Sequence, residues 1–418
     1  MTASTERPTD VPTHPIALAH HAAPAAGENP AARRPAGESS GAAEGPADRV
    51  PAGEGSARPV AAEGPADRTG AVAVGDYAVR AAVAADRVAA RENLAGPALD
   101  AGHFTHLGVR DVPAYRTFRA WVGSVVRVGP SFVRVTLVGD DLCCFADNGF
   151  DQRIKLVFPD RDGGYSSFPD GEDWWEPWRA LPPERRNPVR TYTARAARPG
   201  WRELDVDFAL HGDGGPASRW ALAAGPGHPL LVIGPDSRHD GPVVGAEWSP
   251  PPGATRLLAA GDETAAPALS AIAERLPAHV DARILVEVPE PGDEFPLDVP
   301  PGVRVTWLPR HRPGAPEARH GDLLIPAVRE AARALRAGTA ARVPVDVRDL
   351  PPRPGAGEDE PLWEVPGQAT ADDGFYAWLA GEAGVVKLLR RHLVGDLGVD
   401  RTAVAFMGYW RLGRPEID

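Results

Sequence analysis

The sequence predicts a β-barrel domain followed by an α/β domain with a parallel sheet, both preceded by a disordered amino-terminal tail. Short strand-like runs bounded by Gly, Pro or Asp fill the middle of the chain, which is the pattern of a barrel. Apolar runs then alternate with helical segments, which is typical of a parallel sheet. At 418 residues the chain is long enough for each domain to bury its own core. The predicted boundaries are residues 1–112 for the tail, 113–236 for the barrel and 254–418 for the α/β domain, with an insertion at 338–372.

Residues 1–75 are dominated by Ala, Pro, Gly and Glu, and the segment 42–49 recurs as 61–68. Ordering a residue costs roughly 1–2 kcal/mol of chain entropy, and this composition buries too little apolar surface to offset that cost. Disorder is therefore expected, although the apolar spacing of residues 76–94 favours a short helical arm.

Composition and charge exclude several kinds of partner. The formal net charge is −12 and the arginines are scattered, so no nucleic acid is expected. Cys143 and Cys144 are adjacent, and no His, Cys or carboxylate cluster has ligand spacing, so no metal site is predicted. No apolar run approaches about 18 residues and no secretory signal is recognisable, so we expect a cytoplasmic protein without a membrane span, with a monomer favoured.

The barrel is expected to contain strands at residues 119–128, 132–138, 152–158, 203–211 and 229–235. Each run is rich in β-branched and aromatic residues and ends near Gly, Pro or Asp. The Gly-rich and Pro-rich residues 236–253 should then lead into the second domain.

The stretch R-T-Y-T-A-R at residues 190–195 predicts a flavin-binding strand. Alternation along a strand places Arg190 and Tyr192 on one face and Thr193 on the other. The arginine can bind a phosphate through two hydrogen bonds, and the tyrosine ring can lie against the isoalloxazine. The threonine hydroxyl can hydrogen-bond the redox-active flavin nitrogen.

A glycine turn and a helix start follow the strand at residues 203–211. Residues 212–218 read G-D-G-G-P-A-S, with Pro and Ser in the first turn of the expected helix. Such a helix start presents free backbone N–H groups, which can bind a pyrophosphate. The two patterns together predict that the barrel is a flavin domain.

Residues 160–188 hold Trp174, Trp175 and Trp178 among Asp, Glu and Pro. This segment is too irregular for a predicted strand or helix. Its aromatic side chains are interpreted either as part of a loop over the flavin edge or as a small local core, and both interpretations stay open.

The second domain is expected to contain strands at residues 255–261, 283–288, 303–308, 374–381 and 404–407 and helices at 266–276, 322–336 and 382–393. Continuous apolar strands separated by helices indicate a parallel sheet, whose ligands lie at the carboxyl ends of the strands. The fingerprint G-x-G-x-x-G is absent, so these residues alone indicate only a nucleotide-binding α/β domain.

Five motifs, in order, give the chain a family resemblance. They are R-T-Y-T-A-R at residues 190–195, D-F-A-L-H-G-x-x-G-P-A-S-x-W at 207–220, G-D-E-T-A-x-P at 261–267, A-G-E-A at 380–383 and G-Y-W-R-L-G at 408–413. Together they resemble the siderophore-interacting proteins, which are FAD-dependent ferric-siderophore reductases built like ferredoxin–NADP reductases. Ala266 stands where the family's G-D-E-T-A-L-P has leucine, which is a packing change.

The resemblance implies non-covalent FAD, a nicotinamide nucleotide and a ferric siderophore as substrate, and makes the α/β domain the nicotinamide domain. Together with the patterns above, it predicts a set of cofactor-binding residues in both domains. They are Arg190, Tyr192, Thr193, Asp207, Phe208, His211, Gly215, Ala217, Ser218, Gly261, Asp262, Glu263, Thr264, Gly381 and Glu382.

The predicted activity is hydride transfer from NAD(P)H to FAD, followed by single-electron transfer to siderophore-bound Fe(III). Siderophore oxygens hold Fe³⁺ far better than Fe²⁺, so reduction releases the metal without an iron ligand from the protein. Two alternatives stay open. One is a general flavin or ferredoxin reductase of the same architecture, and the other is a siderophore-binding protein that has lost its cofactor.

Lys155 and Lys387 are the two lysines of the chain, against 43 arginines. A compact ammonium differs from a planar guanidinium at a small negatively charged oxygen, which favours a specific role for Lys155 over a solvated position on a strand face. The resemblance implies that a lysine in this strand lies near the ferric siderophore. We predict a catalytic site in which Lys155 and Arg411 meet at the exposed flavin edge, with Trp410 beside them.

NADH is predicted in preference to NADPH. The strand that reaches Glu287 and Glu290 is where an adenosine ribose would lie in a parallel sheet. Carboxylates there accept a hydrogen bond from a 2′-hydroxyl and repel a 2′-phosphate, and no arginine lies within that turn of the sequence.

Overall fold

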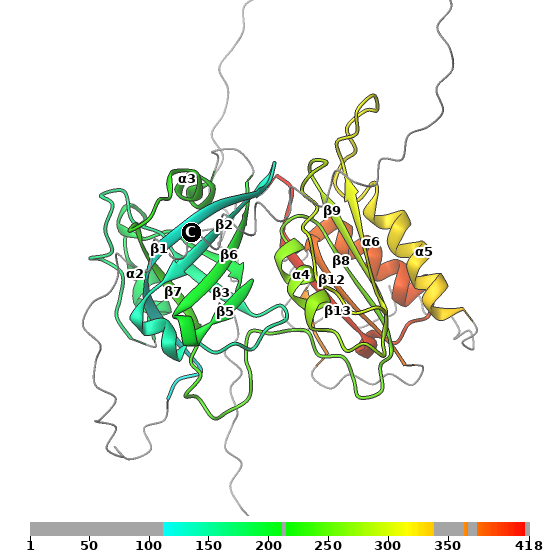
Figure 1. Ribbon diagram of the computed structural model, residues 1–418, viewed down its shortest axis with the longest axis horizontal. Coiled ribbons are helices and arrows are strands. Elements are labelled where there is room, and N and C mark those ends of the chain that lie inside the picture. Colours follow the sequence, from blue (N-terminus) through cyan, green and yellow to red (C-terminus); the bar gives the residue numbers. More distant parts are fainter. Residues whose placement is uncertain (1–111, 172, 211–214, 338–362, 367–373, 414–418) are drawn as a thin grey trace, which may run out of the picture. The chain divides into compact units, whose positions relative to one another are not determined.

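The computed structural model describes residues 112–171, 173–210, 215–337, 363–366 and 374–413 (Figure 1). The predicted tail up to residue 111, His211 and most of the predicted insertion lie outside these ranges. The described residues form two sheets, one of seven strands and one of six.

The first sheet is antiparallel throughout and runs in the order β4-β3-β7-β1-β2-β6-β5. Tyr192 of β4 contacts Phe208 of β6 with ring centroids 4.5 Å apart, although these strands lie near opposite ends of the order. The sheet therefore curls on itself, which confirms the predicted barrel. Its strands are β1 (Tyr115–Gly129), β2 (Phe132–Val138), β3 (Arg153–Val157), β4 (Val189–Thr193), β5 (Ala196–Arg198), β6 (Glu203–Ala209) and β7 (Pro229–Pro235).

The barrel core is built from alternate residues of these strands, because successive side chains of a strand point to opposite faces. Helix α3 (Pro216–Ala223) packs Ala217 and Ala221 against this core. Two short 3₁₀ turns lie in the connections, η1 (Asp140–Cys144) between β2 and β3 and η3 (Pro199–Trp201) between β5 and β6.

The tryptophan-rich segment contains a helix that the sequence did not predict, α2 (Trp175–Ala180), and a 3₁₀ turn, η2 (Pro183–Arg185). Trp174 and Trp178 are buried and pack on strands β3 and β7. The indole N–H of Trp178 donates to the carbonyl of Asn187 at 3.0 Å. Of the two interpretations of these tryptophans, the local core is confirmed, and the expectation of a segment without a helix is wrong.

The second sheet runs in the order β10-β9-β8-β12-β13-β11 and is parallel except at its edge, where β11 pairs antiparallel with β13. The prediction of a parallel sheet holds for the other five strands. Strand β11 was missed because it is two residues long and lies within the predicted insertion. The strands are β8 (Arg256–Gly261), β9 (Asp281–Val288), β10 (Val303–Pro309), β11 (Trp363–Glu364), β12 (Phe375–Glu382) and β13 (Val404–Trp410).

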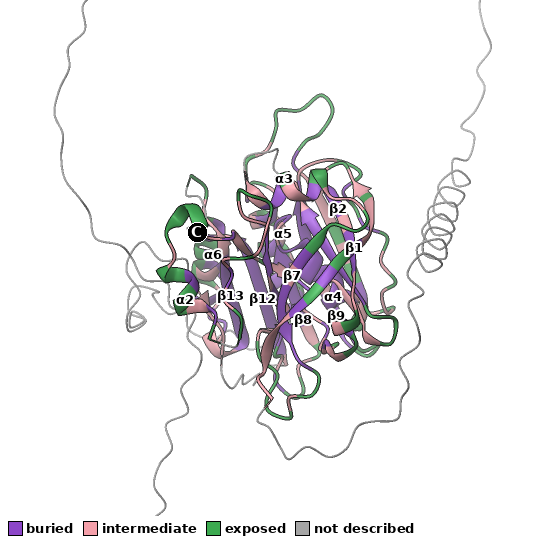
Figure 2. Ribbon diagram, turned by 90° about the vertical axis from the view of Figure 1, so that its left-hand side faces the viewer, coloured by how far each residue is buried: buried purple, intermediate pink, exposed green. Residues whose placement is uncertain are grey.

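Helices cover both faces of this sheet (Figure 1). Leu257 and Ala259 of β8 point toward α4, whereas Leu258 and Ala260 point toward α5 and α6. The central strands are consequently buried along almost their whole length (Figure 2). The helices are α4 (Ala266–Arg275), α5 (Leu324–Arg336) and α6 (Ala383–Arg390), with a π-helical turn η5 (Arg391–Asp396) and a 3₁₀ turn η6 (Arg401–Ala403).

Buried hydrogen bonds join the two sheets. The carboxylate of Asp151, which follows η1, accepts from the backbone N–H of Trp248 at 3.0 Å and from the indole of Trp378 on β12 at 2.9 Å. Burial raises the pKa of Asp151, and these donors oppose that shift. Among the described residues, no helix combines the length and the apolar composition needed to cross a lipid bilayer.

Candidate functional site

The predicted flavin-binding strand is β4, and its side chains alternate as expected. In the β3–β4 register, Arg190 pairs with Leu156 and Tyr192 with Ile154, which are both buried residues of the barrel core. Thr193 lies on the opposite face of the pair. Arg190 and Tyr192 therefore share one face of the strand, as the sequence predicts.

The ring of Tyr192 is supported from inside the barrel. Phe208 is 1% exposed and contacts both Tyr192 and Trp220 of α3, with centroid separations of 4.5 and 5.7 Å. Tyr192 itself is only half-buried. Phe208 was predicted as a cofactor-binding residue, and its burial changes that role to holding the Tyr192 ring in place.

Asp207 was also predicted to bind a cofactor, but its carboxylate points to guanidinium groups inside the barrel. Arg134 donates to its two oxygens at 2.6 and 2.8 Å, and Arg195 lies 3.7 Å away. Asp207 is 1% exposed. The side chain is therefore a counter-charge within the barrel, and a direct contact with a cofactor is not what this geometry offers.

The start of helix α3 is open, which fits a diphosphate. The N-cap position is Gly215, which has no side chain that could cap the helix. A Cβ added to Gly215 would meet no atom of the described residues within 4 Å, so this part of the structure leaves the backbone open to a ligand. Ala217 and Ser218 contribute N–H groups of the first turn, where the helix dipole favours an anion.

In the second sheet, Asp262 lies immediately after β8 and joins the carboxyl ends of three strands. Its Oδ2 accepts from the backbone N–H of Glu382 at 2.7 Å and from the indole N–H of Trp410 at 2.8 Å. Its Oδ1 accepts from the backbone N–H of Thr264 at 3.0 Å and from the Thr264 hydroxyl. The predicted residues of β8, β12 and β13 are thus brought together, but the carboxylate faces the protein rather than a ligand.

Burial and the neighbouring charge of Glu263 raise the pKa of Asp262 to about 7, and the hydrogen bonds from the Thr264 hydroxyl, the Trp410 indole and the backbone of Glu382 act against this shift. In the unfolded chain the same carboxyl loses its proton near pH 4, so between about pH 4 and 7 the folded state binds more protons than the unfolded state. Its contribution to stability therefore falls as the pH rises through that range.

We expect the difference in unfolding free energy between the wild type and Asp262→Asn to decrease as the pH is raised from about 4 to about 7, because only the wild type must ionise this buried group. Urea unfolding at several pH values measures this difference. Asp170→Asn, at an exposed position, is the matched control. A constant difference for Asp262→Asn would contradict the raised pKa.

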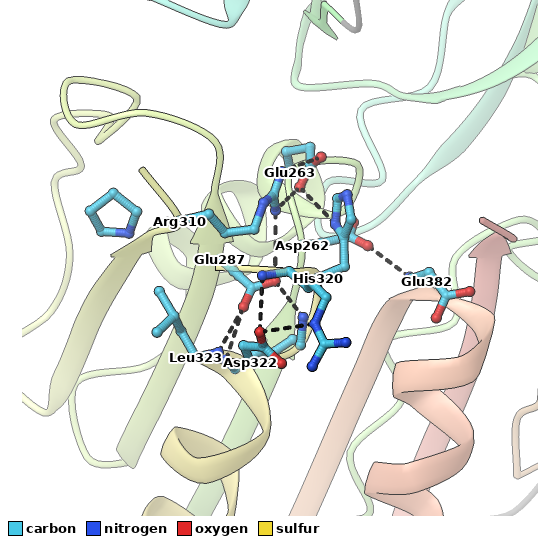
Figure 3. Close-up of polar contacts among 12 residues, drawn as sticks. Asp262, Glu263, Glu287, Arg310, His320, Asp322, Leu323 and Glu382 are labelled. Atoms are coloured by element: carbon cyan, nitrogen blue, oxygen red, sulfur yellow. Dashed lines mark hydrogen bonds and ion pairs between the residues drawn. The ribbon is translucent and has the colours of Figure 1, made fainter. Parts of the chain in front are cut away.

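Glu263 points away from the partners of Asp262 and forms a buried ion pair with Arg310 (Figure 3). Arg310, which follows β10, donates to its two oxygens at 2.7 and 2.9 Å. Burial alone would raise the pKa of Glu263, but the hydrogen bonds and charge of Arg310 hold it below its usual value. Like Asp262, Glu263 is used within the protein, which corrects the expectation of a direct nucleotide contact.

Glu287, the predicted acceptor for a ribose hydroxyl, is buried and already bonded (Figure 3). It accepts from the backbone N–H groups of Gly321, Leu323 and Leu324 at 2.8, 3.1 and 3.1 Å. Arg310 also lies 3.6 Å from its carboxylate. The expectation that Glu287 binds a ribose without an arginine nearby is therefore wrong.

Gly381 and Glu382 end β12 at the predicted site. Gly381 has a φ of 135°, and a Cβ there would lie 2.6 Å from Oδ2 of Asp262, so only glycine fits. Glu382 caps helix α6 by accepting from the backbone N–H of Val385 at 2.8 Å. Its other oxygen accepts from the backbone N–H of Leu412 at 3.3 Å.

The three predicted catalytic residues are placed as follows. Lys155 Nζ donates to Thr191 Oγ1 at 2.9 Å, and the register puts Lys155 on the same face as Thr193. Trp410 is the last residue of β13, and its indole N–H donates to Asp262. Arg411 follows it in the chain and is half-buried. The meeting of Lys155 with Arg411 stays a prediction.

Sequence reasoning missed Arg310 and His320. The His320 ring lies edge-on to the Trp410 ring, with centroids 4.8 Å apart, and its Nδ1 is 4.0 Å from Glu263. The position of Arg310, just beyond the end of a parallel strand, was the available signal.

Asp262, Glu263 and His320 also offer ligand atoms that lie within 4.8 Å of one another. Arg310 already neutralises Glu263 through both carboxylate oxygens. We therefore assign no metal role to this group.

Comparison with known families gives two matches that cover the two sheets. Residues 121–239 match the siderophore-interacting FAD-binding domain. Residues 254–413 match the siderophore-interacting protein family.

Three relatives and one solved structure are similar to the chain. An uncharacterized protein of Mycobacterium tuberculosis is 33% identical over 299 residues, covering 69% of this chain and 88% of the relative. Ferric vibriobactin reductase of Vibrio cholerae is 34% identical over 183 residues, or 44% of this chain and 63% of the relative. NADPH-dependent ferric-chelate reductase of Escherichia coli is 32% identical over 209 residues, or 49% and 75%. A siderophore utilization protein from T. fusca has a TM-score of 0.52 and 28% identity, covering 73% of this chain and 97% of that one.

Proposed function

Because the chain belongs to the siderophore-interacting protein family, we propose that it is a ferric-siderophore reductase that uses FAD and a nicotinamide nucleotide. The relatives named ferric vibriobactin reductase and ferric-chelate reductase support this proposal. The observation that carries it is the arrangement on β4, where the half-buried Tyr192 lies on Phe208 and shares its face with Arg190.

The barrel residues fit FAD. Tyr192 would lie against the isoalloxazine, Arg190 and the open start of α3 would bind the diphosphate, and Thr193 would hydrogen-bond the redox-active nitrogen. When bound, FAD supplies the conversion between a two-electron donor and a one-electron acceptor. The protein's own part is to hold donor and acceptor in turn and to exclude water from the site.

The electron balance fixes the stoichiometry. Each NAD(P)H carries two electrons and each ferric ion accepts one, so one NAD(P)H reduces two ferric siderophores and releases one proton. Oxygen-rich chelators bind Fe²⁺ more weakly than Fe³⁺, so the metal is released after reduction. No protein side chain has to ligate the iron in this scheme.

The test is anaerobic stopped flow of the reduced protein against ferric catecholates and ferric hydroxamates. Rapid reoxidation by at least one ferric siderophore is the expected result. A protein that purifies without flavin, or that reduces flavin and ferredoxin but no ferric siderophore, would overturn the proposal.

Lys155 and Arg411 are proposed to bind the anionic substrate. Ferric triscatecholates carry net negative charge, so fixed cations near the electron donor favour a productive complex. Lys155→Ala and Arg411→Ala should each raise KM for such a substrate about tenfold, which corresponds to about 1.4 kcal/mol. The rate of flavin reduction by the nicotinamide nucleotide should stay near that of the wild type.

Lys387→Ala is the matched control, because Lys387 is the other lysine of the chain and is exposed on α6. Its KM should equal that of the wild type. Added salt should reproduce part of the Lys155→Ala effect, since exposed charges are screened over about 8 Å at physiological ionic strength. Unchanged KM and unchanged salt dependence in both variants would place the substrate elsewhere.

The preference for NADH now rests on Glu290, because Glu287 is bonded within the protein. The relative from E. coli is named NADPH-dependent, and this name favours NADPH instead. A carboxylate near the ribose repels a 2′-phosphate, so we expect a lower KM for NADH than for NADPH and a smaller difference in Glu290→Gln. Steady-state kinetics with both nucleotides decide this, and a lower KM for NADPH would contradict the expectation.

A further inference from the structure

Arg411 lies between two residues that are anchored by carboxylates. On its amino-terminal side, the indole N–H of Trp410 donates to Asp262 Oδ2 at 2.8 Å. On its carboxyl-terminal side, the backbone N–H of Leu412 donates to Glu382 Oε1 at 3.3 Å. The side chain of Leu412 is 67% exposed, so the backbone hydrogen bond, and little side-chain packing, holds this residue.

The first anchor is itself rigidly held. Asp262 is 3% exposed and accepts hydrogen bonds from Thr264 and from the backbone of Glu382 in addition to the indole. Gly381 approaches it so closely that even a Cβ would collide with its Oδ2. The carboxylate therefore has little room to follow the indole if Trp410 moves away.

Glu382, the second anchor, and the ring of Trp410 are also held in place by neighbouring residues. Glu382 accepts from the backbone N–H of Val385 at 2.8 Å, which ties it to the first turn of α6. The His320 ring meets the Trp410 ring at an interplanar angle of 77°. Trp410 is thus held by a hydrogen bond at its N–H and by an edge-to-face contact at its ring.

We propose that Asp262 and Glu382 are positioning residues that bracket Arg411 and fix its backbone, so that its guanidinium is preorganised for an anionic ligand. A cation on a fixed backbone loses less conformational freedom on binding than the same cation on a mobile carboxyl-terminal segment, and so binds more tightly. This inference rests on the proposed function, in which the anionic ligand is a ferric siderophore.

Limited trypsin digestion of the flavin-loaded protein tests the bracket without measuring activity. Trypsin cleaves after Arg411 only when the segment detaches from the sheet. Trp410→Phe keeps an aromatic ring but removes the N–H donor, and it should raise the rate of this cleavage about fivefold, as should Asp262→Asn and Glu382→Gln. Cleavage after Arg161, an exposed residue of the barrel, should not change. Equal rates of cleavage after Arg411 in the wild type and in Trp410→Phe would overturn the bracket.

Kinetics in two backgrounds test whether the bracket acts through Arg411. Trp410→Phe should raise KM for a ferric triscatecholate about fivefold when Arg411 is present. In the Arg411→Ala background the same substitution should leave KM unchanged, because nothing remains to be positioned. An equal further increase in that background would show that Trp410 acts on the substrate by itself and would overturn the inference.

The two experiments separate this inference from the proposed function. If the wild type reduces no ferric siderophore, the proposed function falls, while faster cleavage after Arg411 in the variants still supports the bracket. If the wild type is an active reductase and the cleavage rates are equal, the bracket falls and the proposed function stands.

Discussion

Arg310→Met is expected to lower the free energy of unfolding by about 3–5 kcal/mol, because it leaves the carboxylate of Glu263 buried without its counter-charge. Arg310 is 6% exposed and Glu263 0%, and the two are joined by hydrogen bonds of 2.7 and 2.9 Å. Methionine keeps most of the side-chain volume, so the loss reports the missing charge. Urea unfolding followed by tryptophan fluorescence measures it.

Two further variants separate the charge from other effects. The double variant Arg310→Met/Glu263→Gln should recover part of the lost stability, since it removes the unpaired charge of Glu263, while the buried Glu287, 3.6 Å from Arg310, still loses its arginine. Arg319→Met removes an exposed arginine that pairs with Asp322 at 3.4 Å, and should change stability little. A small effect of Arg310→Met would mean that the carboxylate of Glu263 reaches water.

The same ion pair has a defined pH dependence. Because Arg310 holds the pKa of Glu263 below its ordinary value, the folded state keeps this carboxylate ionised at a lower pH than the unfolded state does. The stability that it contributes is present above the ordinary carboxyl pKa and is lost as the pH falls through the lowered one. This is opposite in sign to the effect of Asp262.

Arg190→Ala is expected to purify with flavin occupancy lowered more than tenfold. A charge-assisted bidentate contact to a phosphate contributes about 1.5–3 kcal/mol, which is enough for that change. Arg190 shares its strand face with Tyr192, so the substitution should weaken flavin binding without disturbing the ring contact with Phe208. The ratio of flavin absorbance to protein absorbance after purification gives the occupancy.

Arg190→Lys should lie between the wild type and the alanine variant, because an ammonium keeps the charge but cannot form the planar fork. Arg161→Ala, at an exposed position of the barrel, should keep full occupancy. A fully flavinylated Arg190→Ala would contradict the phosphate role.

Most strands of both sheets could be predicted because the pattern that identifies a strand lies within its own few residues. Period-two alternation identifies β2 and β6, and continuous apolar runs identify β8 and β12. The face shared by Arg190 and Tyr192 follows from the same alternation. Strands β5 and β11 and helix α2 could not be predicted, since each is short and depends on pairing or packing with other strands.

The sequence could not predict which partners the acidic side chains contact. Asp262 and Glu263 are adjacent in a motif that suggests a ligand site, yet each turns to a partner far along the chain, Trp410 and Arg310 respectively. Glu287 likewise bonds to the backbone before α5. Such contacts depend on which loops meet at the end of the sheet, and neither composition nor spacing encodes that.

The carboxylates of Glu287 in β9 and of Glu382 at the end of β12 also bear on how long each nucleotide would stay bound under the proposed function. Glu287 accepts backbone N–H groups at the start of α5, and Glu382 accepts one at the start of α6, so negative charge of the chain itself fills both helix starts. Helix α3 begins at Pro216, and its N-cap residue Gly215 provides no side-chain cap. The barrel thus offers an uncapped helix start to a diphosphate, whereas carboxylates already occupy the two helix starts of the parallel sheet. Under the proposed function, this difference would favour retaining FAD through many turnovers and exchanging the nicotinamide nucleotide after each.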